Sequence, residues 1–171
     1  LHVRSRRQRQ MCIRDRYQVE DFETIFRLSQ DRPTIVRLLD PPLHEFLPSS
    51  EEDINNVSQQ LNVSSEFLRK RIVDLNEVNP MLGHRGCRLA VTYPELYEMQ
   101  VEAIIESVIK LQKEGITCLP EIMIPLVSTV EEFTTLKERL VNTITHLEKE
   151  SQQDIQYMIG TMTVSYTHLR A

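Results

Sequence analysis

The sequence predicts an α/β protein built on a parallel β-sheet, with helices between successive strands. Three short runs rich in apolar and β-branched residues occur at residues 34–39, 121–127 and 156–162. Between them, apolar residues recur at helical spacing. The strand runs are continuously apolar rather than alternating, which is typical of a parallel sheet covered on both faces. A doubly wound sheet and a (β/α) barrel both fit this pattern.

The first half of the chain predicts one strand and three helices. Apolar spacing indicates a helix over 19–30, and Asp40-Pro41-Pro42 ends the strand at 34–39 because paired prolines cannot continue a ladder. Ser49-x-x-Glu52 is a capping box that would begin a second helix. A third helix is expected over 64–77. Together, the last two helices look like an insertion carried on a loop.

The second half alternates more regularly. Thr92-x-x-Glu95, with a proline between, predicts a capped helix that runs to about residue 114 and stops at Gly115. Thr129-x-x-Glu132 predicts another capping box and a helix to about residue 150. These two helices flank the strand at 121–127, and the strand at 156–162 follows them.

Length and composition narrow the function classes. A chain of 171 residues holds one domain or a piece of a larger one, and 40% hydrophobic with 26% charged residues is globular. No apolar run is long enough to cross a membrane. Three cysteines exclude a disulfide scaffold and indicate a reducing compartment, so we expect a cytoplasmic protein. A net charge of −5 argues against nucleic acid as a partner, and no glycine-rich nucleotide fingerprint is present.

The two ends differ from the middle. Residues 1–16 hold six arginines and one acid, whereas residues 17–163 are acidic. Such an arm could bind nucleic acid or an anionic membrane, or act as a targeting peptide. MCIRDR near the start and VSYTHLRA at the end, however, look like translated adapter sequence. We therefore expect 1–16 and 164–171 to be non-native tails around a native fragment at 17–163.

Arg37 is the first candidate for chemistry, because it stands in an otherwise apolar strand where an unpaired charge is costly. It could form a buried ion pair with Asp40 or Glu45. It could instead face a phosphate or carboxylate at the strand's C-terminal end, since its planar fork of donors suits both anions.

The loop from Gly83 to Arg88 is the second candidate. Its two glycines allow close approach of the backbone to a ligand, and Arg85 and Arg88 could clamp an anion or simply pair with nearby acids. A zinc site from His84 and Cys87 is disfavoured because no second ligand pair stands at metal spacing.

Four segments together resemble the pyruvate, phosphate dikinase family, in its C-terminal barrel that binds phosphoenolpyruvate (PEP) or pyruvate. They are RLLDPPLHEFLP at 37–48, NPMLGHRGCRL at 79–89, TYPELYEMQ at 92–100 and PEIMIPLV at 120–127. The resemblance extends over nearly all of residues 17–162, including the spacing between segments. It implies a partial (β/α)8 TIM-type barrel with a helical insertion, which selects the barrel from the two architectures above.

The resemblance also implies a reaction. The intact enzyme would convert pyruvate, ATP and phosphate reversibly to PEP, AMP and diphosphate, using Mg²⁺ and a phosphohistidine on a separate domain. Arg37 matches an arginine that binds the phosphoryl group and substrate, and Arg85 and Arg88, in a loop beside the site, are expected to bind substrate as well. A cytoplasmic homodimer is implied, with ATP and phosphate bound by domains outside this chain and with no nucleic acid or membrane partner.

One departure bears on activity. Val164 stands where the family has a metal-binding glutamate, and valine offers no oxygen ligand. The phosphohistidine and the catalytic cysteine of the family also lie outside the chain, so we expect this fragment to be inactive, with no catalytic residue of its own. Two alternatives stay open: a PEP synthase-like enzyme with the same barrel, and a helical interaction module with a basic arm. The module would give Arg37 and Arg85 no reason to converge.

Overall fold

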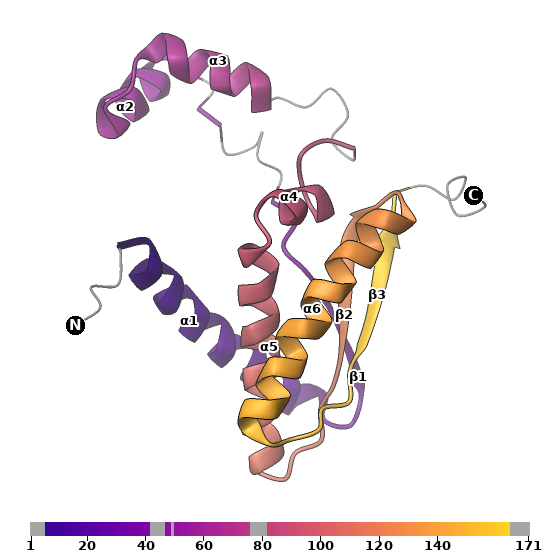
Figure 1. The fold of residues 1–171 in the computed structure, drawn as a ribbon. Coiled ribbons are helices and arrows are strands. Elements are labelled where there is room, and N and C mark those ends of the chain that lie inside the picture. Colours follow the sequence, from indigo (N-terminus) through magenta and orange to yellow (C-terminus); the bar gives the residue numbers. More distant parts are fainter. Residues whose placement is uncertain (1–5, 42–46, 49, 76–81, 165–171) are drawn as a thin grey trace.

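The computed structural model describes residues 6–41, 47–48, 50–75 and 82–164. Six helices and three strands occur in this part of the chain (Figure 1): α1 (Arg6–Ser29), β1 (Pro33–Arg37), α2 (Glu51–Leu61), α3 (Ser65–Leu75), α4 (Cys87–Thr92), α5 (Glu95–Lys113), β2 (Leu119–Val127), α6 (Val130–Ser151) and β3 (Met158–Thr163). None of the helices described is long and apolar enough to cross a membrane.

The three strands form one parallel sheet in the order β1-β2-β3. Arg37 of β1 pairs in register with Met123 of β2, and Met123 pairs with Gly160 of β3. The α/β class and the parallel sheet predicted from the sequence are therefore confirmed. Three strands do not close a barrel, so the barrel itself stays a prediction.

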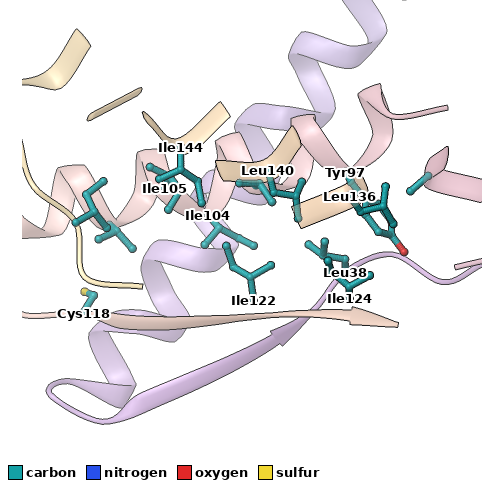
Figure 2. Packing of buried hydrophobic residues seen from close by; sticks show 14 of the residues in the cluster. Leu38, Tyr97, Ile104, Ile105, Cys118, Ile122, Ile124, Leu136, Leu140 and Ile144 are labelled. Carbon is teal, nitrogen blue, oxygen red and sulfur yellow. The ribbon is translucent and has the colours of Figure 1, made fainter. Parts of the chain in front are cut away.

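The hydrophobic core lies on one face of this sheet. Figure 2 shows Ile122 and Ile124 of β2 against residues of α5 and α6, among them Ile104, Leu136 and Leu140. Phe26 of α1 belongs to the same cluster, because α1 packs against α5.

None of the described helices covers the opposite face of the sheet, which corrects, for this part of the chain, the expectation of a sheet covered on both sides. Ile35 and Met158 are 59% and 62% exposed. The reason is that α1, α5 and α6 contribute to one shared core instead of dividing between the two faces.

The first helix is longer than the sequence pattern predicts. It begins at Arg6 rather than Val19, so the arginine-rich segment continues into it without a break. Residues 6–29 contain no glycine or proline and are rich in arginine and glutamine, which are good helix formers.

Helices α2 and α3 are the two helices that the sequence predicts between the first strand and the loop at 83–88, and their role as an insertion stays a prediction. They pack against each other and lie away from the sheet (Figure 1). The N-cap of α2 is Ser50, whose side chain accepts from the backbone N–H of Asp53. The cap is thus one residue later than predicted, and Ser49 lies outside the described residues.

In the second half of the chain, the predicted ends at Thr129 and Gly115 are correct, and the one at Thr92 is wrong. Thr129 and Glu132 form the complete capping box of α6, and Gly115 ends α5 with a positive φ of 82°. Thr92, however, does not cap α5, since it is the last residue of α4 and its hydroxyl donates to the Arg88 carbonyl. Pro94 occupies the N-cap of α5 without any side-chain hydrogen bond.

Candidate functional site

The sequence-predicted site residues lie at the C-terminal edge of the sheet. Arg37 is the last residue of β1, and Arg85 and Arg88 flank the start of α4. Because β1 and β2 are parallel, their C-terminal ends lie at the same edge. Helix α4 contacts β2 and α6 there, which brings the loop at 83–88 to the end of β1.

Asp40 is the centre of this edge. Its side chain is only 1% exposed, and Arg85 binds it with both arms of the fork: Nε lies 2.8 Å from Oδ1 and a terminal guanidinium nitrogen 2.9 Å from Oδ2. Arg37 approaches the same Oδ2 at 3.5 Å. Arg37 and Arg85 therefore converge on one carboxylate, although 48 positions separate them in the sequence numbering.

The two arginines differ in how tightly they are held. The Arg85 side chain is 16% exposed and makes the bidentate pair, whereas Arg37 is 52% exposed and makes one long contact. A guanidinium that is half-exposed at a strand end keeps most of its donors for a ligand. Arg37 is thus the more accessible cation of the pair.

Backbone hydrogen bonds fix the segment that carries Asp40. The Leu38 N–H donates to the Met123 carbonyl, and the Leu39 N–H donates to Oε1 of Gln100 at 2.8 Å. The Tyr97 hydroxyl, from the same helix as Gln100, donates to the Leu39 carbonyl at 2.9 Å. Burial, reinforced by nearby acidic groups, raises the pKa of Tyr97, so this donor stays protonated.

Gly86 makes room for the Asp40 pair. Its φ is +54°, a conformation that residues with a side chain rarely adopt. A Cβ at this position would stand 3.2 Å from Oδ1 of Asp40 and 3.3 Å from a methyl carbon of Leu126. A glycine is therefore required here both by the backbone conformation and by the close approach of Asp40.

Arg88 belongs to a second cluster, at the end of β2. Its Nε lies 3.0 Å from Oε1 of Glu132, and a terminal nitrogen donates to the Ser128 hydroxyl at 2.7 Å. The other oxygen of Glu132 accepts from the backbone N–H of Ser128, its hydroxyl and the N–H of Thr129. Burial alone would raise the pKa of Glu132, but these hydrogen bonds and the Arg88 charge together lower it.

Cys87 is a packing thiol. It is a free, buried cysteine, and its thiol donates to the Leu126 carbonyl. Burial, with the Glu132 charge, raises its pKa to about 11, so it is a thiol and a poor nucleophile near neutral pH.

The described residues do not form a metal site. Within the described ranges no three acidic, histidine or cysteine side chains come together to hold an ion. His84, which the sequence already disfavours as a zinc ligand, contacts the Thr92 hydroxyl and the Tyr93 ring. Val164 hydrogen-bonds through its backbone N–H to the Val127 carbonyl and presents a hydrocarbon side chain. We therefore assign no step to Mg²⁺ among the residues that the structure describes.

Sequence reasoning found some of these residues and missed others. It placed Arg37 at a strand end and named Asp40 as one partner, while the other named partner, Glu45, lies outside the described residues. It did not anticipate that Arg85 holds Asp40, or that Glu132 binds Arg88. The capping box at Thr129 was a signal for Glu132, but only as a helix cap.

The cluster of Arg37, Asp40 and Arg85 can bind an anion. In the described part of the chain, two guanidinium groups meet one carboxylate here, and the Arg37 side chain is half-exposed. This exposed guanidinium lies at the C-terminal edge of a parallel sheet, where α/β proteins bind their ligands. Arg37 offers the planar donors that phosphate and carboxylate groups accept.

Comparison with known proteins gives one consistent family. The model for "PEP-utilising enzyme, PEP-binding domain" matches residues 4–165. Pyruvate, phosphate dikinase of Rickettsia felis is 47% identical over 146 residues, which cover 85% of this chain and 17% of that protein. The dikinase of Clostridium symbiosum is 44% identical over 147 residues, again 85% of this chain and 17% of the relative.

A plant relative gives the same result. The chloroplastic pyruvate, phosphate dikinase 1 of Arabidopsis thaliana is 44% identical over 148 residues, which cover 85% of this chain. The chain spans only 15–17% of the length of the curated relatives it matches.

Proposed function

This chain belongs to the PEP-utilising enzymes, through their PEP-binding domain, and from that premise we propose that it forms part of the PEP and pyruvate site of a pyruvate, phosphate dikinase. The intact enzyme would convert pyruvate, ATP and phosphate to PEP, AMP and diphosphate. ATP and phosphate would bind to parts of that enzyme beyond this chain. By itself the chain would not catalyse the reaction.

The observation that carries this proposal is the half-exposed guanidinium of Arg37 at the end of β1. PEP and pyruvate are small anions with a carboxylate, and PEP adds a phosphoryl group. Arg37 would bind the phosphoryl or carboxylate oxygens with its outward donors. Fixed cations at that point stabilise the charge that spreads over the phosphoryl oxygens during transfer, which is how such reactions are mostly catalysed.

The convergence of two distant arginines on Asp40 favours this proposal over a helical interaction module. A module of that kind gives Arg37 and Arg85 no reason to meet. Mg²⁺ remains an expectation for the intact dikinase, where oxygen ligands outside the described residues would hold it.

A hybrid dikinase tests the proposal. Residues 17–162 of this chain would replace the matching segment of the Rickettsia felis enzyme, and formation of PEP would be measured at several pyruvate concentrations. Arg37→Ala should lower kcat/KM by about 10²–10³-fold, the range seen when one donor to a developing charge is removed.

Arg139→Ala is the matched control. Arg139 is also half-exposed and also makes one long ion pair, at 3.7 Å to Glu98, but it lies on α6 away from the β1 edge. It should leave kcat/KM unchanged. An active hybrid in which Arg37→Ala performs like Arg139→Ala would rule the proposed role out.

A further inference from the structure

We propose that Arg85 is not a substrate ligand but a positioning residue, which occupies Asp40 and thereby leaves Arg37 available for the anionic substrate. The inference rests on the proposed function and concerns the same site. It changes the role expected for Arg85 from the sequence, which was direct contact with substrate.

The first step of the argument is the unequal sharing of Asp40. Arg85 takes both carboxylate oxygens, at 2.8 and 2.9 Å, in the bidentate geometry that suits a guanidinium best. Arg37 reaches only Oδ2, at 3.5 Å, the outer limit of a hydrogen bond. The carboxylate is thus already satisfied by Arg85 before Arg37 contributes.

The second step is burial. The Asp40 side chain is 1% exposed, and a buried carboxylate that loses its counter-charge is strongly destabilising. In the described part of the chain, Arg37 is the other cation at Asp40. Without Arg85, Arg37 would therefore be drawn fully onto Asp40, and its donors would turn away from the ligand.

The third step is that Asp40 cannot follow Arg37 outward. The preceding residue, Leu39, is held at its N–H by Gln100 and at its carbonyl by Tyr97, both from α5. Gly86 packs directly against Oδ1 from the other side. Since Asp40 stays in place, whether Arg37 faces inward or outward depends on whether Arg85 is present.

The test measures the accessibility of Arg37 in the full chain. Phenylglyoxal modifies exposed guanidinium groups, and peptide mapping by mass spectrometry gives a rate for each arginine. Arg85→Met should slow the modification of Arg37 about tenfold, because a hydrogen bond between charged groups replaces solvent. The double variant Asp40→Asn with Arg85→Met should restore the wild-type rate, since no carboxylate remains to capture Arg37.

Two comparisons keep the test decisive. Asp40→Asn alone removes the buried charge and should leave Arg37 at least as reactive as in the wild type. This variant still tests the inference if circular dichroism shows that Arg85→Met does not fold. Arg139, which pairs with Glu98, should react at one rate in every variant. An unchanged or faster Arg37 in folded Arg85→Met, or a slower one in Asp40→Asn, would overturn the inference.

The hybrid dikinase separates this inference from the proposed function. Arg85→Met should raise the KM for the substrate, and the double variant with Asp40→Asn should recover it. If the double variant is as weak as Arg85→Met while Arg37 is reactive in both, Arg85 is a substrate ligand and the inference is wrong. If Arg37→Ala is fully active, the proposed function fails, whatever the modification rates show.

Discussion

Two carboxylates at the same edge of the sheet, Asp40 and Glu132, hold arginines from the same loop, but they do so in opposite ways. Glu132 receives one arginine and three N–H or O–H donors, so its charge and its lone pairs are both satisfied within the fold. Asp40 receives two arginines, Arg85 tightly and Arg37 loosely, and the loosely held Arg37 is half-exposed.

We infer from this difference that the Glu132 cluster is structural and that the Asp40 cluster takes part in binding. The Glu132 cluster ties α4, the end of β2 and the start of α6 together. The Asp40 cluster has a more deeply buried carboxylate and a second arginine, Arg37, that is half-exposed. We therefore expect damage at Glu132 to appear as lost stability, and damage at Arg37 to appear as lost binding.

The largest stability effect should come from Glu132→Ala. The change leaves Arg88 without its carboxylate and removes the capping box of α6, so we expect a loss of about 3 kcal/mol in the free energy of unfolding. Urea titration followed by circular dichroism measures it. Glu131→Ala, at the exposed neighbouring position, should cost little. The contrast between the two clusters is contradicted if Glu132→Ala leaves the free energy of unfolding unchanged. It is also contradicted if Glu132→Ala alters the phenylglyoxal reactivity of Arg37 as strongly as Arg85→Met does.

Gly86→Ala should lower the free energy of unfolding by about 2 kcal/mol, because it combines a strained positive φ with a close contact between the new Cβ and Asp40. Gly115→Ala is a matched control, since Gly115 also has a positive φ but a Cβ there would meet nothing within 4 Å. The same unfolding experiment gives both values. Equal losses for the two variants would mean that the close approach of Gly86 to Asp40 has no energetic weight.

Thr129→Ala should have a smaller effect and lower the free energy of unfolding by about 1 kcal/mol, because α6 loses its N-cap side chain. Ser50→Ala removes the same kind of cap from α2, which packs against α3 rather than the sheet. The Ser50 change should therefore alter helix content locally and barely move the global transition. Thermal unfolding of both variants checks this, and the opposite ranking would place α2 within the cooperative core.

The smallest expected effect is on the pH dependence of stability. Because the pKa of Glu132 is lowered in the folded chain, its stabilising contribution is complete above the ordinary value of 4.5 and is lost as the pH falls through the lowered value. Glu132→Gln should show a flatter decline of unfolding free energy below pH 4.5 than the wild type. Parallel declines would show that Glu132 does not titrate differently in the two states.

Local signals predicted much of the fold. The continuous apolar runs located all three strands within a few residues, and the Thr129 capping box located α6, because those features depend on neighbours in sequence. The assignment of Thr92 as a cap failed because a short helix, α4, competes for the same residues. The start of α1 was also missed, since no breaker separates the arginine-rich segment from Val19.

The site was predicted less completely than the fold. The isolated charge of Arg37 in an apolar strand was visible in the sequence, as was the cationic loop around Arg85. The pairing of Arg85 with Asp40 was not, because it depends on how α4 docks at the sheet edge and on a glycine that lets the two approach. Ion pairs between distant segments have no local sequence signature.

The most direct measurement compares the phenylglyoxal reactivity of Arg37, Arg85 and Arg88 in the hybrid dikinase, with and without PEP. Arg37 should react fastest of the three, and saturating PEP should slow that reaction, while Arg85 and Arg88 stay slow in both states. The account would be contradicted if Arg85 or Arg88 reacts faster than Arg37, or if PEP leaves Arg37 as reactive as before.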